Sequence, residues 1–190
     1  MARRLTNSTH IKLSGCDLPI NTSQGKYRCY EEILERTYSQ MDAMLSHHSR
    51  ALIFRLDLSC ESYTSDNKLV SKLIRKLRKH LLTQYNMKRF GYVWVREQEK
   101  AKAQHYHLVL IVDANKVRHP SKILQWLEAR WQPYGRPWTP KNCFYLVGRD
   151  DHTKLAEAFE RISYLAKERG KGYVPAGTNS YSASRLALKD

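Results

Sequence analysis

Apolar and polar positions along the chain recur with periods that predict helices and strands in regular succession. Apolar side chains at helical spacing predict helices over residues 30–46 and 65–85. Between them, residues 51–59 form one apolar face (Leu52, Phe54, Leu56 and Leu58) and one mainly polar face (Ile53, Arg55, Asp57 and Ser59), which predicts a half-buried strand. Arg55 and Asp57 fall on the polar face of that strand, so we expect a charge pair there.

The centre of the chain carries the pattern of a hairpin. Residues 90–98 are rich in aromatic residues and valine, residues 98–104 are polar, and residues 105–112 include five consecutive apolar residues. This pattern predicts two antiparallel strands joined by a short turn. Similar reasoning predicts three later elements, a helix over residues 119–132, a strand over 143–148 and a helix over 153–169.

The predicted order, α-β-α-β-β-α-β-α, indicates an α+β fold. A tight hairpin combined with helical crossovers predicts an antiparallel or mixed sheet with helices mainly on one face, which leaves the second face free for a site. We expect a partly ordered N-terminal arm over residues 1–28, a folded domain over 29–170, and a basic, loosely ordered tail over 171–190.

Charge narrows the choice of partner. The chain has 190 residues with 33 Lys and Arg against 18 Asp and Glu, a formal net charge of +15. Nucleic acid is the first partner that such an excess indicates, although a basic protein without a polyanionic partner or one that binds acidic lipid would show it too. The four cysteines form no Cys-x-x-Cys pair, which argues against a Cys-type zinc site. No signal peptide or membrane span is evident, so a cytoplasmic protein is expected.

Two histidines stand at the start of the predicted buried strand. His105 and His107 are two residues apart, so they share one face and lie close enough to hold one ion. Taken alone, they are more simply two polar residues on the wet face of an antiparallel strand. With a five-residue loop, Glu99 would face His105 and Glu97 would face His107, so both carboxylates could reach the pair. A loop of even length would turn them to the opposite face.

A tyrosine and a lysine are neighbours on the last predicted helix. Tyr164 falls off the apolar stripe of that helix, and Lys167 follows it by three residues. In isolation this is most simply an exposed Tyr and Lys on a wet helix face. Together with a divalent metal on two histidines and a carboxylate, a tyrosine assisted by an ammonium group is suited to phosphodiester transesterification.

The helix predicted over residues 65–85 has a strongly basic face. Its six Lys and Arg residues form either a solvated surface or a track for nucleic-acid phosphates. From this face we take four residues as candidate DNA contacts: Lys72, Arg75, Lys76 and Lys79.

Three motifs in this order resemble the single-tyrosine HUH endonucleases, which initiate rolling-circle replication of plasmids and phages. They are an Arg-x-Asp-Leu strand (residues 55–58), His-x-His followed by an apolar strand (105–112), and Tyr-x-x-Lys (164–167). The narrower resemblance, which includes Arg96-Glu97-Gln98, is to the YagK/YfjJ C-terminal domain family of prophages and inoviruses. It covers about residues 51–169.

The resemblance implies a fold, a metal and a reaction. The fold would be an RRM-like (ferredoxin-like) HUH domain with a central antiparallel sheet of about five strands. His105, His107 and a third ligand, for which we choose Glu97 over Glu99, would bind Mg²⁺ or Mn²⁺. Tyr164 would form a 5′-phosphotyrosine bond with DNA, and Lys167 would position or activate it.

The resemblance also implies partners and secondary roles. Arg55 and Asp57 would contact DNA or support the structure. The substrate would be single-stranded or hairpin DNA at a replication origin, with a helicase and polymerase supplied by the bacterial host or the phage, and no small-molecule substrate is implied. The alternative is a prophage regulator that binds DNA or RNA without catalytic activity, and it predicts that Tyr164→Phe has no effect.

Overall fold

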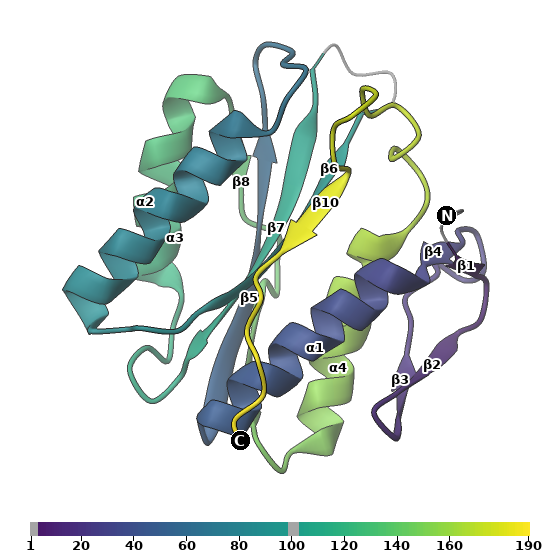
Figure 1. The fold of residues 1–190 in the computed structure, drawn as a ribbon, viewed down its shortest axis with the longest axis vertical. Coiled ribbons are helices and arrows are strands. Elements are labelled where there is room, and N and C mark those ends of the chain that lie inside the picture. Colours follow the sequence, from purple (N-terminus) through teal and green to yellow (C-terminus); the bar gives the residue numbers. More distant parts are fainter. Residues whose placement is uncertain (1–3, 99–102) are drawn as a thin grey trace.

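The computed structural model describes residues 4–98 and 103–190, and an antiparallel sheet forms its centre (Figure 1). The strands of this sheet are β5 (Arg50–Ser59), β6 (Gly91–Glu97), β7 (His105–Asp113), β8 (Pro137–Trp138), β9 (Phe144–Gly148) and β10 (Tyr181–Ala183). They run in the order β10-β6-β7-β5, and β5 pairs on its far side with both β8 and β9. The sheet therefore has six strands, where about five were expected.

The helices and the remaining short elements surround this sheet. The α-helices are α1 (Glu31–His47), α2 (Lys68–Tyr85), α3 (Ser121–Trp131) and α4 (His152–Ser163). The 3-10 helices are η1 (Gln132–Tyr134) and η2 (Tyr164–Ala166). The N-terminal strands are β1 (Leu5–Thr6), β2 (His10–Leu13), β3 (Cys16–Pro19) and β4 (Cys29–Tyr30). None of the helices in the described ranges is both long enough and apolar enough to span a bilayer.

Helices cover both faces of the sheet. Figure 1 shows α2 and α3 on one side and α1 and α4 on the other. Along β7, Leu108 and Leu110 belong to the core beneath α2 and α3, whereas Val109 and Ile111 belong to the core beneath α1 and α4. A strand that is apolar on both faces needs cover on both faces. The prediction of helices mainly on one face is therefore wrong, although the α+β class and the antiparallel sheet are confirmed.

The predicted order of the main elements is present, with differences where local signals were weak. The α-helix predicted to reach residue 169 ends at Ser163 and continues as the 3-10 turn η2. The Pro- and Gly-containing loop over residues 133–140 includes the two-residue strand β8, which pairs with β5. The N-terminal arm folds as a hairpin of β2 and β3, with Leu18 buried in the core beneath α1 and α4.

The tail contributes a strand that the sequence did not predict. β10 pairs antiparallel with β6, so that Tyr181 lies opposite Val95 and Ala183 lies opposite Val93. Just beyond it, the buried Ser184 accepts a hydrogen bond from the backbone N–H of Tyr92 at 2.9 Å. Part of the tail predicted to be loosely ordered is thus an edge strand of the sheet.

Candidate metal centre

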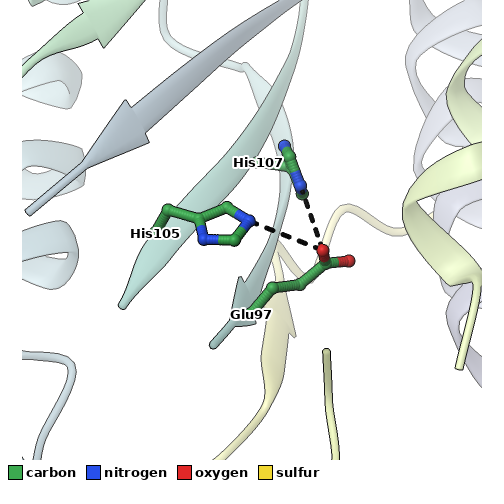
Figure 2. Close-up of side chains that lie close together, drawn as sticks. All are labelled: Glu97, His105 and His107. Atoms are coloured by element: carbon green, nitrogen blue, oxygen red, sulfur yellow. Dashed lines mark hydrogen bonds and ion pairs between the residues drawn. The ribbon is translucent and has the colours of Figure 1, made fainter. Parts of the chain in front are cut away.

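A glutamate and two histidines converge at one end of the central hairpin (Figure 2). One potential ligand atom from each of Glu97, His105 and His107 lies within 4.8 Å of the others. Glu97 Oε2 is 3.5 Å from His105 Nε2 and 3.3 Å from His107 Nε2. Two imidazole nitrogens and a carboxylate oxygen can hold one divalent metal ion and leave further coordination positions open. The three predicted ligands are therefore brought together.

The hairpin achieves this with a different register from the one we expected. Glu97 is directly opposite His105, and His107 is opposite Val95. The expected pairing of Glu97 with His107 is therefore wrong by two residues. The connection spans residues 98–104 instead of five residues, and since both lengths are odd, Glu97 still projects from the face that carries the histidines. Glu99, the other ligand considered, lies outside the described residues.

The adjacent strand orients His107. Asp57 on β5 is directly opposite His107, and its Oδ1 lies 2.8 Å from His107 Nδ1. Hydrogen bonds to His107 and Arg55 lower the pKa of the Asp57 carboxyl, although burial opposes them, so the carboxylate can only accept. Asp57 thus fixes the ring so that Nε2 faces Glu97, and a proton held on Nδ1 by this carboxylate would leave Nε2 free to bind a metal.

Arg55 completes this arrangement. Its guanidinium donates two hydrogen bonds to Asp57, from Nε to Oδ1 and from Nη2 to Oδ2, both at 2.8 Å. Nη2 also lies 3.0 Å from His107 Nδ1. The side chains of Arg55 and Asp57 are only 11% and 14% exposed, so both are largely shielded from solvent. The charge pair predicted on the polar face of β5 is present, and it supports the histidine.

Two lysines from the segment after α4 approach Glu97. The fully buried Lys171 donates from Nζ to Glu97 Oε1 at 2.6 Å and to the carbonyl of Lys167. Lys167 Nζ lies 3.6 Å from Glu97 Oε2. Burial alone would raise the pKa of Glu97, but contacts with both imidazoles and the charge of Lys171 hold it well below its usual range. Glu97 is therefore ionised at neutral pH.

Gly170 lets the chain pass close to this carboxylate. Its φ is +78°, and a Cβ at this position would lie 3.2 Å from Glu97 Cβ. Its carbonyl accepts a hydrogen bond from the backbone N–H of Gln98 at 2.9 Å. A glycine is required here both for the left-handed backbone and for the close approach. Gly170 thus closes the site around Glu97.

Tyr164 lies beside the residues that surround His107. Lys167 Nζ is 3.8 Å from the centroid of the Tyr164 ring, and the guanidinium carbon of Arg55 is 6.0 Å from it. Arg55 in turn contacts His107 Nδ1. The half-buried tyrosine is thus linked to the histidine cluster through one arginine and to Glu97 through one lysine. The predicted neighbours Tyr164 and Lys167 do lie together.

The candidate DNA contacts on α2 lie elsewhere. This helix covers the sheet face opposite the histidines. Lys72 and Arg75 line a cavity between α2 and the sheet, near Tyr92. Lys76 and Lys79 are exposed on the same helix and do not line that cavity. The basic face of α2 is therefore not part of the candidate metal centre.

Sequence reasoning missed Lys171 and the contact of Asp57 with His107. Lys171 falls in the tail that the sequence predicts to be loosely ordered, because Gly170 and the residues after it carry no periodic pattern. A buried lysine held against a carboxylate leaves no local signal in the sequence. The Asp57–His107 contact depends on which strand pairs with β7, and strand order is not encoded in either strand alone.

Protonation of this cluster is expected to destabilise the metal-free protein below about pH 4, the usual range of unfolded carboxyls. Because the folded-state pKa values of Asp57 and Glu97 are lowered, their contribution is present above that pH and is lost as the pH falls. Asp57→Asn should cost about 2 kcal/mol at pH 7 and flatten the decline in acid. Urea unfolding from pH 7 to pH 3 measures both, with exposed Asp150→Asn as the control. A decline as steep as in the wild type would contradict the assignment of Asp57.

The protein is thus an α+β domain with a Glu-His-His cluster, a potential metal site, at the end of its central hairpin. The family model of the YagK/YfjJ C-terminal domain matches residues 19–181, most of the chain. The protein therefore belongs to the YagK/YfjJ C-terminal domain family, as the resemblance indicated. Comparison with curated proteins and with solved structures gave no significant match.

Proposed function

We propose that this protein is a single-tyrosine HUH endonuclease that nicks and rejoins single-stranded DNA at a specific origin site. The observation that carries the proposal is the position of Tyr164, whose ring contacts both Lys167 and Arg55 beside the cluster of Glu97 and the two histidines. A nucleophile, a cation and a potential metal centre are the groups that phosphodiester transfer requires.

The metal of this proposal is Mg²⁺ or Mn²⁺. Glu97, His105 and His107 would hold it, and an ion with open positions would polarise the phosphoryl oxygens of the scissile phosphate. Two imidazole nitrogens suit Mn²⁺ better than Mg²⁺, because Mg²⁺ prefers oxygen ligands. Asp57 and Arg55 would keep His107 in the orientation that ligation needs.

The chain's own residues would support a balanced exchange of one ester for another. The oxygen of Tyr164 attacks the phosphorus, a bond from phosphorus to that oxygen forms, and the bond from phosphorus to the 3′ oxygen breaks. The phenol loses its proton, and the departing 3′ oxygen gains one. Lys167 would offset the negative charge that develops on the attacking oxygen and the phosphoryl group. Attack by a 3′-hydroxyl on the 5′-phosphotyrosine reverses the step and rejoins the strand.

The proposed setting is a rolling-circle replicon of a prophage or inovirus. The substrate would be single-stranded or hairpin DNA at the origin in the cytoplasm of a bacterial host. Unwinding and synthesis would depend on host or phage enzymes. No small-molecule substrate is proposed.

One observation favours the alternative of a nucleic-acid-binding regulator without catalytic activity. Glu97 already has the ammonium groups of Lys171 and Lys167 at 2.6 and 3.6 Å, so its charge is balanced without a metal. In this alternative the cluster would be a structural network of ion pairs, and metal would neither bind nor matter.

A covalent-capture experiment separates the two proposals. The protein is incubated with single-stranded and hairpin oligonucleotides in Mn²⁺, Mg²⁺ or a chelator, and adducts that survive denaturation are resolved on a gel. We expect an adduct in Mn²⁺, less in Mg²⁺ and none with chelator. Because a 5′-phosphotyrosine retains the downstream fragment, a label at the 3′ end should travel with the protein and a label at the 5′ end should not. An adduct that carries the 5′ label, or one that resists the chelator, would refute the proposed chemistry.

A further inference from the structure

A second candidate site lies on the sheet face opposite the metal centre. A cavity of about 850 Å³ opens between α2 on one side and strands β6 and β10 on the other. We call it the α2 groove, and the residues that matter for its chemistry are Lys68, Lys72, Arg75 and Arg78 of α2, Tyr92 of β6 and Ser182 of β10. Strand β6 supplies Tyr92 to this groove and Glu97 to the metal centre, from its two opposite faces.

The wall formed by α2 is positive, and part of its charge is unbalanced. The helix contains no Asp or Glu among its 18 residues. Lys68 pairs with Asp66 at 2.9 Å, and the guanidinium of Arg78 lies over the ring of Phe90 at 4.9 Å. In the described parts of the chain, Lys72 and Arg75 have no acidic partner. Two exposed cations one helical turn apart, on the wall of a concave surface, are suited to successive phosphates.

The opposite wall offers an aromatic surface. Tyr92 is half-buried on β6, and the neighbouring Trp94 is buried on the same face of that strand and also borders the groove. An unpaired base can stack on a partly exposed tyrosine, whereas a base within a duplex cannot reach a recessed ring. Phosphate-binding cations opposite an aromatic ring are the pattern of a single-strand binding surface.

We propose that the α2 groove binds single-stranded DNA, with phosphates on Lys72 and Arg75 and a base on Tyr92. The choice of DNA over RNA rests on the proposed function, whereas the recognition of phosphates and of an unpaired base rests on the groove itself. The site would hold DNA that flanks the nicking point, on a surface separate from the one that carries Tyr164. The edge strand β10 would complete the groove through Ser182.

The test compares two double variants of the same helix that remove the same charge. Lys72→Gln with Arg75→Gln alters the groove, and Lys76→Gln with Lys79→Gln alters the exposed face outside it. Affinity for a labelled 20-nucleotide single strand and for its duplex is measured by fluorescence anisotropy in chelator at several salt concentrations. We expect the groove pair to reduce the salt slope for the single strand by about 1.4 units, since each phosphate contact contributes about 0.7. The control pair, whose residues the sequence also offered as candidate DNA contacts, should leave that slope unchanged, because both lie outside the groove.

Tyr92 provides an independent arm of the same test. Tyr92→Leu is expected to weaken single-strand binding about tenfold, as the loss of one stacked base would, and to leave duplex binding unchanged. Equal effects of the two charge pairs, or tighter binding of duplex than of single strand, would overturn the proposal. These measurements need no metal and no adduct. A negative result for the groove therefore leaves the nicking proposal intact, and a negative adduct experiment leaves the groove proposal intact.

Discussion

Replacing Tyr164 by Phe is expected to abolish the covalent protein–DNA adduct while leaving DNA affinity unchanged. The substitution removes only the phenol oxygen, which is the proposed nucleophile, and keeps the ring that lies 3.8 Å from Lys167 Nζ. Loss of a nucleophile costs about 10³-fold or more in rate, so the adduct should fall below detection on a denaturing gel. Anisotropy with the same oligonucleotide measures the unchanged affinity.

The matched control for this variant is another tyrosine of the same chain. Tyr173 follows the site by nine residues, is 65% exposed and has no proposed role, so Tyr173→Phe should form the adduct at the wild-type yield. An adduct that persists in Tyr164→Phe, and maps to another residue by peptide mass spectrometry, would remove Tyr164 from the proposal. A wild-type protein that forms no adduct with any origin hairpin would leave the regulator as the better account.

His107→Ala is expected to weaken Mn²⁺ binding by about 100-fold or more, because it deletes one of three ligands. Asp57→Asn should have a smaller effect of about 10-fold, since it only releases the orientation of His107. Titration calorimetry of the metal-free protein with Mn²⁺ measures both constants. The exposed His10 on β2 supplies the control, and His10→Ala should bind Mn²⁺ like the wild type.

The calorimetric result also bears on the two lysines that contact Glu97. If Lys171 and Lys167 merely neutralise a structural carboxylate, the wild type should bind Mn²⁺ no better than His107→Ala. Equal and negligible heats in both proteins would exclude the metal centre. A tight site in the wild type that vanishes in His107→Ala would show that a metal competes successfully with the ammonium groups.

Much of the site could be predicted because its residues follow the two-residue period of a strand and the three-residue spacing of a helical turn. Residues two apart on a strand share a face, so His105 and His107 had to lie together, and the odd loop length kept Glu97 with them. Three positions separate Tyr164 from Lys167, and helical spacing made them neighbours even though the α-helix stops at Ser163.

The parts that escaped prediction depend on distant pairings. The five consecutive apolar residues of β7 indicate that both sheet faces are covered, whereas the alternation of β5 predicts that one face is exposed to solvent. In fact Ile53 is buried beneath α1 and α4, and Arg55 and Asp57 on the same face are held close to His107. The burial of Lys171 depends on the path of the chain after η2, for which no periodic pattern exists.

The pairing of β10 with β6 determines where this chain can be truncated or tagged. Without Tyr181–Ala183, the backbone N–H and C=O groups along the outer side of β6 would lack partners and be open to strands of other molecules. Strand β6 ends at Glu97, so disorder of its outer edge would also disturb the Glu97 carboxylate. Removing the last ten residues is therefore expected to promote self-association and to loosen the Glu-His-His cluster. An affinity tag is better placed at the N-terminus.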